Sequence, residues 1–213
     1  MMREIPINKL KIDDSDRILI VAPHPDDEII GCGGVIVKHG HLCDVILLTD
    51  GCKGHTQWSE SRTRRVRESE FRHVMEQAKV SNYYILGHMD RELNKQWDVY
   101  LMMDLEKYTH IFIPNCEERH PDHYSAFRQM FIDQMIHHRR IQYYQYEVWT
   151  PLARPTHIFD ISESIDEKIQ LLALYKSQID ELNYIDAVKG LNKYRGSLNQ
   201  MNYAECYKLG LWK

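Results

Sequence analysis

Short apolar runs alternate with longer amphipathic segments along this chain. The run Arg-Ile-Leu-Ile-Val-Ala at 17–22 is rich in β-branched residues and ends at Pro23, which is typical of a buried parallel strand. In segment 59–79, by contrast, apolar residues recur at roughly helical spacing, which indicates a long amphipathic helix. The pattern predicts strands at 17–22, 44–49, 83–86, 110–114, 142–149 and 157–161, and helices at 29–40, 59–79, 98–108, 122–137 and 164–176.

The order of these elements predicts the fold class. Strands alternate with helices through at least the first 140 residues, a pattern typical of βαβ units. We therefore expect an α/β protein with a Rossmann-like layered fold, in which helices flank a mostly parallel sheet. No linker rich in Pro, Gly and Ser divides the chain, so residues 1–213 are expected to form one domain. Residues 51–58 and 88–97 are expected to be long loops, which often carry function.

The composition excludes several classes of protein. With 213 residues, of which 43% are hydrophobic and 27% charged, the chain is globular rather than disordered. The formal net charge is -4 and no basic stretch dominates, so nucleic acid is not an expected partner. No run approaches the ~20 apolar residues that cross a bilayer, so no membrane span is expected.

The five cysteines are scattered and include no Cys-x-x-Cys pair, which argues against a zinc ribbon or a thioredoxin-type motif. Cys32, Cys43 and Cys116 fall in or beside apolar segments, as buried reduced thiols do. We therefore expect a reducing, cytoplasmic environment. A homo-oligomer is compatible with the sequence, because an interface could be formed by Trp58, Trp97 and the aromatic-rich C-terminal third.

Two short polar segments follow predicted strands and combine imidazole with carboxylate groups. Residues 23–28 read Pro-His-Pro-Asp-Asp-Glu and follow the first strand, and residues 120–123 read His-Pro-Asp-His and follow the fourth. Asp50 and Gly51 end the second strand in a similar way. Because ligands bind beyond the carboxyl ends of the strands in open parallel sheets, we expect the three segments to meet at one edge of the sheet.

His24, Asp27 and His123 form a candidate metal site. His24 and Asp27 are three residues apart and can face one side as the chain turns into a helix. Two imidazoles and one carboxylate leave an open position for water, as in catalytic zinc sites, and the metal lowers the pKa of that water toward ~7. Asp26, beside Asp27 in the chain, is the candidate general base for the water.

The second segment supplies further candidates. As an imidazolium, His120 could stabilise an oxyanion or protonate a leaving amine, and Asp122 could hold His120 in the right tautomer. Structural roles are the alternative, because residues 26–28 could cap a helix and His-Pro-Asp-His could be a turn before a helix cap. The presence of both segments, each after an apolar strand, favours metal-assisted hydrolysis.

These segments resemble the two signatures of the PIG-L/LmbE-like family of metal-dependent N-acetyl-sugar deacetylases. Residues 49–51, Thr-Asp-Gly, are similar to the family's usual end of the second strand, and residues 67–70 look like its Arg-x-x-Glu helix motif. Further similar positions are Gly33-Gly34, Asp160-Ile161-Ser162, Lys168, Tyr175, Ser177-Gln178, Tyr194-Arg195-Gly196 and Ala204-Glu205. The resemblance covers roughly residues 16–207, and the combination of motifs is highly specific.

The resemblance implies roles for individual residues. Zinc would be held by His24, Asp27 and His123, although iron or another divalent ion suits the same ligands. Asp26 would be the general base, and His120 would act on the tetrahedral intermediate or the leaving amine. Arg67 and Asp50 would contact the substrate, while the alternative for Arg67 is a surface salt bridge with Glu70 or a neighbour.

Two positions extend or depart from the family pattern. Some members carry a tyrosine that assists catalysis in the loop before the second signature, where this chain has Glu118. Residues 146–151, Tyr-Glu-Val-Trp-Thr-Pro, resemble a subgroup of the family. They either line the sugar site or form a buried edge strand with Trp149 in the core.

The residues and the resemblance together predict a metal-dependent hydrolase. It would remove an acetyl group from an N-acetylated amino sugar or glycoconjugate and release acetate. The alternatives are hydrolysis of another amide or ester by the same centre, and sugar binding without turnover. The sequence identifies neither the sugar nor the physiological metal.

Overall fold

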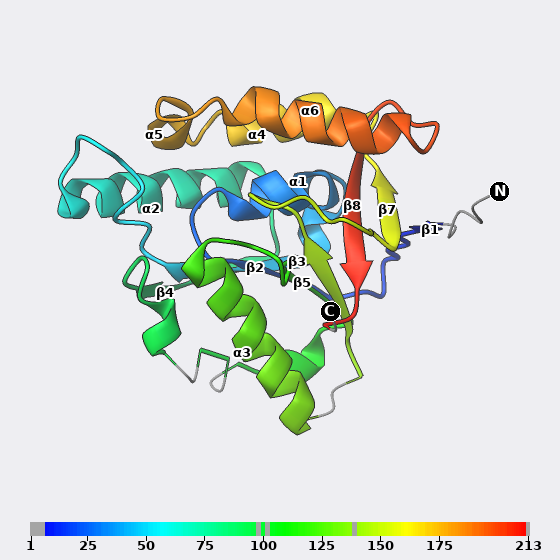
Figure 1. Ribbon diagram of the computed structural model, residues 1–213, viewed down its shortest axis with the longest axis horizontal. Coiled ribbons are helices and arrows are strands. Elements are labelled where there is room, and N and C mark those ends of the chain that lie inside the picture. Colours follow the sequence, from blue (N-terminus) through cyan, green and yellow to red (C-terminus); the bar gives the residue numbers. More distant parts are fainter. Residues whose placement is uncertain (1–6, 97–98, 101–102, 138–139, 212–213) are drawn as a thin grey trace.

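The computed structural model describes residues 7–96, 99–100, 103–137 and 140–211. Its centre is an eight-stranded sheet with helices on both faces (Figure 1), and the strand order is β1-β7-β8-β6-β5-β2-β3-β4. The strands are β1 Asn8–Lys9, β2 Ile18–Ala22, β3 Cys43–Thr49, β4 Asn82–His88, β5 His110–Pro114, β6 Gln142–Tyr146, β7 His157–Asp160 and β8 Ala204–Leu209. The α-helices are α1 Asp27–His39, α2 Glu60–Gln77, α3 Pro121–His137, α4 Ile165–Leu172, α5 Lys176–Ile179 and α6 Tyr184–Ser197.

The central strand β2 is buried along its whole length because both faces of the sheet are covered. Ile18, Ile20 and Ala22 pack in one hydrophobic core with residues of α1, α2 and α4. Leu19 and Val21 pack in a second core with residues of α3. Figure 1 shows α3 on the opposite side of the sheet from the other helices. This two-sided burial explains why the strand reads as a continuous apolar run.

The sheet confirms the predicted α/β class and its mostly parallel pairing. β2 pairs in parallel with β3 and with β5, while β3 pairs in parallel with β4 and β5 with β6. β8 runs antiparallel to both β6 and β7. The C-terminal strand therefore joins the parallel part of the sheet to the short pair formed by β1 and β7.

The helix predicted at 98–108 is wrong for the residues of that segment that the structure describes. They form turns and one short 3-10 helix at Leu105–Lys107. Val99, Tyr100, Leu105 and Tyr108 are all buried in the second core. On a helix these four positions would spread over more than half of the circumference, so a helix lying on the sheet could not bury them all. Burial thus outweighs the local helical pattern.

The C-terminal third departs further from the prediction. The segment predicted as one helix at 164–176 divides into α4 and α5, and neither α6 nor β8 was predicted. The strand predicted at 142–149 ends at Tyr146, because the backbone N–H groups of residues 148–150 donate to the Glu118 carboxylate.

Two further expectations can be compared with the structure. Cys32, Cys43 and Cys116 are buried free thiols, as predicted, and so are the other two cysteines. Among the helices that the structure describes, none has both the length and the apolar character needed to cross a bilayer.

The strand order determines where a ligand can bind. From β2 the chain moves outward to β3 and β4, and it then returns to the other side of β2 to form β5 and β6. The direction of progress through the sheet therefore reverses between β2 and β5. In open α/β sheets the crevice beyond the carboxyl ends at such a point is the usual ligand site. Both polar signatures begin there.

Candidate active site

The first signature forms a sharp turn between β2 and α1. His24, Asp26 and Asp27 are all buried, although they lie in the turn after β2 and at the first residue of α1. Asp26 has a φ of 123°, which residues other than glycine rarely adopt. Glu28 supports this turn, because one of its carboxylate oxygens accepts from the Asp26 N–H at 3.2 Å and the other from the Tyr175 hydroxyl at 2.5 Å. A strained residue held by buried partners is a frequent feature of functional sites.

The three predicted metal ligands lie together. Asp27 Oδ2 is 3.3 Å from His24 Nδ1 and 3.1 Å from His123 Nε2, and the two ring nitrogens are 3.2 Å apart. Three atoms bound tetrahedrally to one zinc at ordinary bond lengths lie about 3.3–3.4 Å from one another. The spacing and the chemistry of this donor set therefore fit a single divalent ion. His120 also has a ring nitrogen within 4.8 Å of those of His24 and His123.

Two carboxylates stand behind His24. Its Nε2 is 3.1 Å from Asp122 Oδ2 and 3.3 Å from Asp90 Oδ1. Nε2 is therefore the ring nitrogen that carries a proton toward the carboxylates, and Nδ1 is left to face Asp27 and His123. Carboxylates in this position fix the tautomer and the ring orientation of metal-binding histidines.

Asp122 thus has a different partner from the one that the sequence suggested. Its carboxylate accepts from the backbone N–H groups of Arg91, at 2.6 Å, and Leu93, at 3.1 Å, as well as contacting His24. The start of α3 turns the side chain toward the loop after β4, and only the backbone N–H of Asp122 reaches His120. Asp122 orients His24 and the 91–93 loop rather than His120.

The surroundings of His120 favour its neutral form. Its Nδ1 accepts from the Asp122 N–H at 3.3 Å, so the neutral ring carries its proton on Nε2. The pKa of His120 is lowered to about 4, mainly by burial and also by the nearby His24 and His123. The sequence suggested an imidazolium, but the structure favours a neutral imidazole that can donate a hydrogen bond from Nε2.

Glu118 takes the place behind His123. One of its oxygens lies 3.6 Å from His123 Nδ1, and the other accepts from the backbone N–H groups of residues 148–150, each at 3.1 Å. Burial alone would lower the pKa of His123, but the carboxylates of Asp27 and Glu118 raise it to about 9. Glu118 therefore does not occupy the position of a tyrosine facing the substrate.

Asp26 pairs with Arg67, whose Nη2 is 3.3 Å from Asp26 Oδ2. The same guanidinium donates to the carbonyls of Pro25 and Gly51. Burial raises the pKa of Asp26 to about 7, although the Arg67 charge opposes this shift. A carboxylate with a pKa near neutrality can both accept and return a proton at physiological pH.

The two predicted substrate contacts lie in different places. Arg67 lines the cleft described below and pairs with Asp26 instead of Glu70. Asp50 does not line it. Its carboxylate accepts from the N–H groups of Cys52 and Asp90 and is 2.5 Å from Arg64 Nη2, so it holds the loops that follow β3 and β4 together.

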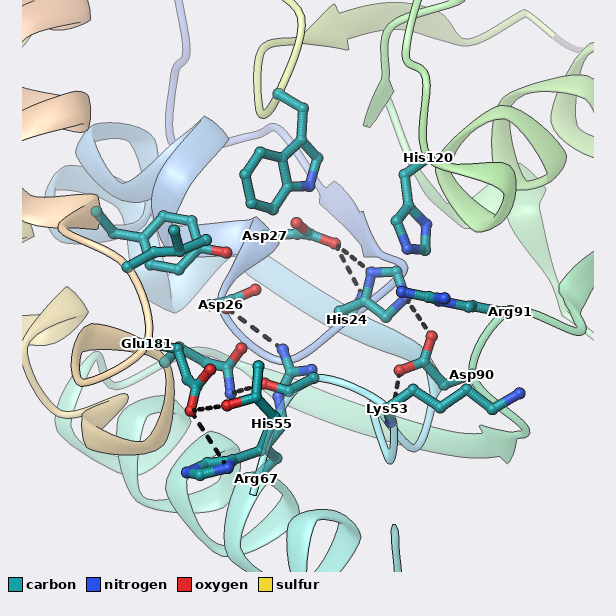
Figure 2. Close-up of a pocket in the computed structure, with 16 residues that line it drawn as sticks. His24, Asp26, Asp27, Lys53, His55, Arg67, Asp90, Arg91, His120 and Glu181 are labelled. Atoms are coloured by element: carbon teal, nitrogen blue, oxygen red, sulfur yellow. Dashed lines mark hydrogen bonds and ion pairs between the residues drawn. The ribbon is translucent and has the colours of Figure 1, made fainter. Parts of the chain in front are cut away.

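His24, Asp26 and Asp27 line a cleft of about 390 Å³, which we call the catalytic lobe. Figure 2 shows His55 and Glu181 on one side of it and His120 and Arg91 on the other. The predicted loop 51–58 supplies a wall, and it is fixed to the C-terminal third because the Gln178 side chain donates to the Gly54 carbonyl. Trp149, 49% exposed, lies on the rim and not in the core, so the alternative that placed it in the core is wrong.

Sequence reasoning missed several residues of the cleft. Asp90 follows β4 at the same edge of the sheet as the two signatures. It could have been identified because ligands bind beyond the carboxyl ends of the strands in open parallel sheets. No local pattern marks Glu181 or Tyr184, which come from the connection between α5 and α6 and from the start of α6. They reach the cleft only because the C-terminal helices fold back over α1 and α2.

The family model described as PIG-L, GlcNAc-PI de-N-acetylase, matches residues 19–133, which is more than half of the chain and includes both signatures. The chain belongs to the PIG-L family. The PIG-L match thus covers β2 to α3, the part of the fold that carries the ligand set and Asp26.

Solved structures share the fold of this PIG-L member. A conserved protein from Thermus thermophilus has a TM-score of 0.78 at 25% identity, covering 91% of this chain and 94% of that one. The N,N'-diacetylchitobiose deacetylase from Pyrococcus horikoshii has a TM-score of 0.73 at 22% identity, covering 92% and 84%. GalB, the 4-carboxy-2-hydroxymuconate hydratase from Pseudomonas putida, has a TM-score of 0.71 at 17% identity, covering 92% and 97%.

Proposed function

We propose that this PIG-L member is a metal-dependent hydrolase that removes the acetyl group from an N-acetylated amino sugar or glycoconjugate. The main support for the proposal is that candidate metal ligands and a candidate general base lie side by side. Three ligand atoms lie at the spacing of one divalent ion, and the neighbouring Asp26 has a pKa of about 7. The family match and the deacetylase among proteins of the same fold support it.

His24, Asp27 and His123 would hold the ion. Zinc is the first expectation for two imidazoles and a carboxylate, and iron or another divalent ion accepts the same set. When bound, such an ion acts as a Lewis acid and lowers the pKa of water to about 7. Asp122, Asp90 and Glu118 would keep the two imidazoles oriented for it.

The remaining residues would perform the proton transfers. Asp26 accepts a proton from the water that attacks the acetyl carbonyl, and the neutral His120 donates a hydrogen bond from Nε2 to the oxygen on which charge develops. The C–N bond then breaks, and Asp26 returns the proton to the leaving amine. Water and the N-acetyl group thus become acetate and a free amine. Arg67 holds the Asp26 carboxylate in position for both transfers.

The rim of the cleft is suited to a sugar. Trp149 and Tyr184 line it with their ring centroids 5.6 Å apart, and Glu181 and His55 add polar groups. Aromatic faces beside hydrogen-bonding groups suit a ligand with apolar C–H faces and hydroxyls. The fold alone does not decide the reaction, because one protein that shares it is a hydratase.

The test is acetate release from a panel of N-acetyl amino sugars by protein loaded with zinc, iron(II) or cobalt. We expect turnover that a chelator abolishes. Asp26→Asn should lower kcat by a factor on the order of 10²–10⁴ while the bound metal, measured by elemental analysis, is retained. Asn is preferred to Ala here because it better tolerates the positive φ of this position.

Asp14→Asn, at an exposed aspartate that does not line the cleft, is the matched control and should leave turnover unchanged. Release of a different acid or alcohol by the metal-loaded protein would favour the amide or ester alternative. Binding of the sugars without acetate release under any metal would instead favour a non-catalytic family member.

A further inference from the structure

The turn that carries Asp26 is held from two sides by separate buried partners. On one side, Arg67 Nη2 donates to the Pro25 carbonyl at 2.8 Å and lies 3.3 Å from Asp26 Oδ2, a contact drawn in Figure 2. On the other side, Glu28 accepts from the Asp26 N–H and from the Tyr175 hydroxyl. Arg67, Glu28 and Tyr175 are all buried. Different residues therefore fix the side chain and the main chain of Asp26.

The two partners are also joined to each other behind the turn. Glu70, one helical turn after Arg67 on α2, accepts from the Ser177 hydroxyl at 2.6 Å and from the Ser177 N–H at 2.9 Å. Ser177 lies in α5, and Tyr175 directly precedes that helix. Because α5 packs against α2 (Figure 1), contacts lead from Arg67 through both helices back to Tyr175. We call this closed set of contacts the Asp26 support, and its members are Asp26, Glu28, Arg67, Glu70, Tyr175 and Ser177.

The Asp26 support maintains an unfavourable backbone conformation. Residues other than glycine rarely adopt a φ such as the 123° of Asp26. A strained conformation of this kind persists only where the surrounding structure determines it, and such conformations collect at functional sites. The loss of one contact in the support should therefore let Asp26 relax, and its carboxylate would move.

The candidate metal ligands have a different set of supporting residues. Asp90 and Asp122 stand behind His24, and Glu118 stands behind His123. None of these three carboxylates belongs to the Asp26 support. The positions of the ligands and of the candidate base can therefore be disturbed separately.

We propose that Tyr175 and Glu70 are positioning residues that hold the Asp26 carboxylate where it accepts and returns the proton. The proposal deepens the proposed deacetylation and rests on Asp26 as its base. Tyr175 acts through Glu28 on the main chain of Asp26. Glu70 acts through Ser177, because this contact holds α5, and with it Tyr175, against the helix that carries Arg67. A misplacement of about 1 Å at a reacting group can lower a rate by about 10²-fold.

The competing role is purely structural, in which Tyr175 and Glu70 hold α5 on α2 and do nothing more. Their loss would then lower stability, but the molecules that fold would turn over at the natural kcat. The two roles differ in their dependence on Asp26. Effects of residues that act as a unit are not additive, so a residue that acts through Asp26 has no further effect once Asp26 is disabled.

The first test uses the metal-loaded full-length protein and the N-acetyl sugar that it hydrolyses fastest. Tyr175→Phe removes only the hydroxyl, and kcat should fall about 10–100-fold while KM and the affinity for the metal stay unchanged. Glu70→Ala should act in the same direction. Glu70→Gln, which keeps an oxygen that can accept from Ser177, should recover part of the loss.

Tyr108→Phe is the matched control. The Tyr108 hydroxyl is also buried and donates to a buried carboxylate, that of Asp44, at 2.7 Å. Asp44 lies near the start of β3, at the opposite edge of the sheet from the cleft. Tyr108→Phe should therefore lower stability in urea unfolding but leave kcat unchanged.

The second test combines Tyr175→Phe with Asp26→Asn. We expect the double variant to have the same kcat as Asp26→Asn alone, because both changes affect the same proton transfers. A full additional fall in kcat would overturn the proposal. Weaker metal binding in Tyr175→Phe would also overturn it, because the residue would then act through the ligands.

A crystal structure of Tyr175→Phe gives a measurement that does not depend on activity. We expect the φ of Asp26 to leave the positive region or its carboxylate to leave Arg67, while the three ligand atoms keep their places. An unchanged Asp26 would overturn the proposal. If the natural protein releases no acetate with any metal, the deacetylase proposal fails, and this structure still decides the positioning role. If Tyr175→Phe releases acetate at the natural kcat, the positioning role fails and the deacetylase stands.

Discussion

At the residue scale, Glu118 connects the candidate metal ligands to the rim of the cleft. One of its oxygens accepts from the N–H groups of residues 148–150 and from the Asn115 amide, and the other faces His123 Nδ1. The first contact fixes the turn that carries Trp149. The second, a contact of 3.6 Å, favours a proton on Nδ1, which leaves Nε2 as the nitrogen that would bind an ion beside Asp27. One buried carboxylate thus orients a ligand and a rim residue.

We predict that Glu118→Gln weakens metal binding by about 10–100-fold without unfolding the protein. The Gln oxygen can still accept from residues 148–150, but its NH₂ group would then face His123 Nδ1. Two donors cannot face each other, so the ring proton moves to Nε2 and blocks the ligand position. Competition with a chromophoric chelator measures the affinity. Glu117→Gln, at the exposed neighbouring residue, should bind metal like the natural protein. Unchanged affinity in Glu118→Gln would rule out this orienting role.

His110, at the start of β5 and away from the cleft, gives a pH-dependent prediction. Burial lowers the pKa of His110 below the ordinary histidine value of about 6.5, and the carboxylates of Asp16 and Asp13 only partly oppose this shift. The unfolded chain therefore takes up a proton at a higher pH than the folded one. The stability contribution of His110 is full above pH 6.5 and is lost as the pH falls through and below that value.

The variant His110→Gln should accordingly reduce the loss of stability on acidification. Urea unfolding of the metal-free protein between pH 8 and pH 5 measures the slope, and one proton contributes at most about 1.4 kcal/mol per pH unit. His41→Gln, on the partly exposed connection after α1, serves as the matched control. Parallel pH profiles for the natural protein and His110→Gln would contradict the assignment.

At the element scale, α1 is placed by glycines that let it approach its neighbours closely. A Cβ atom on Gly34 would lie 2.2 Å from Ile161 Cγ2, and one on Gly31 would lie 2.1 Å from Tyr146 Cδ2. These distances are far below van der Waals contact, so only glycine allows this packing. Because α1 begins at Asp27, the position of the helix also sets the position of a candidate ligand.

We predict that Gly34→Ala lowers the free energy of unfolding by about 1–3 kcal/mol or more, because the added methyl overpacks the core. Gly190→Ala is the matched comparison. Gly190 lies within α6, where a Cβ atom would have no neighbour within 4 Å, so the same change should stabilise the protein by about 0.4–1 kcal/mol. Urea denaturation measures both. A loss of stability in Gly190→Ala equal to that in Gly34→Ala would show that contact with Ile161 is not the cause.

The elements also show how far the sequence predicts this structure. Strands such as β2, β3 and β5 are buried on both faces, so their apolar runs identify them directly. The ligand set could be predicted because His24 and Asp27 are close in sequence and strand order brings His123 beside them. The partners of Asp122 and Glu118 could not be predicted, since they depend on how loops from β4 and β6 approach α3. The turns at 103–108 could not be predicted either, because burial of Leu105 and Tyr108 in the second core determines them and the local helical pattern does not.

At the scale of the whole molecule, the C-terminal third closes over the N-terminal part through a buried network. Lys168 of α4 donates to the Ile30 carbonyl of α1, to Asn192 of α6 and to Glu205 of β8. All four residues are buried, and each of the Lys168 ammonium hydrogens has an acceptor. The family-like positions Lys168 and Glu205 are therefore structural. They hold in place the connection that brings Glu181 and Tyr184 to the cleft.

A bound metal would stabilise the same whole-molecule arrangement. His24 and Asp27 follow β2, whereas His123 lies 99 residues further along the chain than His24, so only the folded chain brings the three ligands together. At a free metal concentration 100 times the dissociation constant, we expect the free energy of unfolding to rise by about 2.7 kcal/mol. Thermal and urea unfolding with and without a chelator measure this gain. His123→Asn should abolish it, while Asp26→Asn should retain it, because Asp26 is assigned to proton transfer and not to the metal. A full gain in His123→Asn, or its loss in Asp26→Asn, would show that the division between ligands and base has been assigned to the wrong residues.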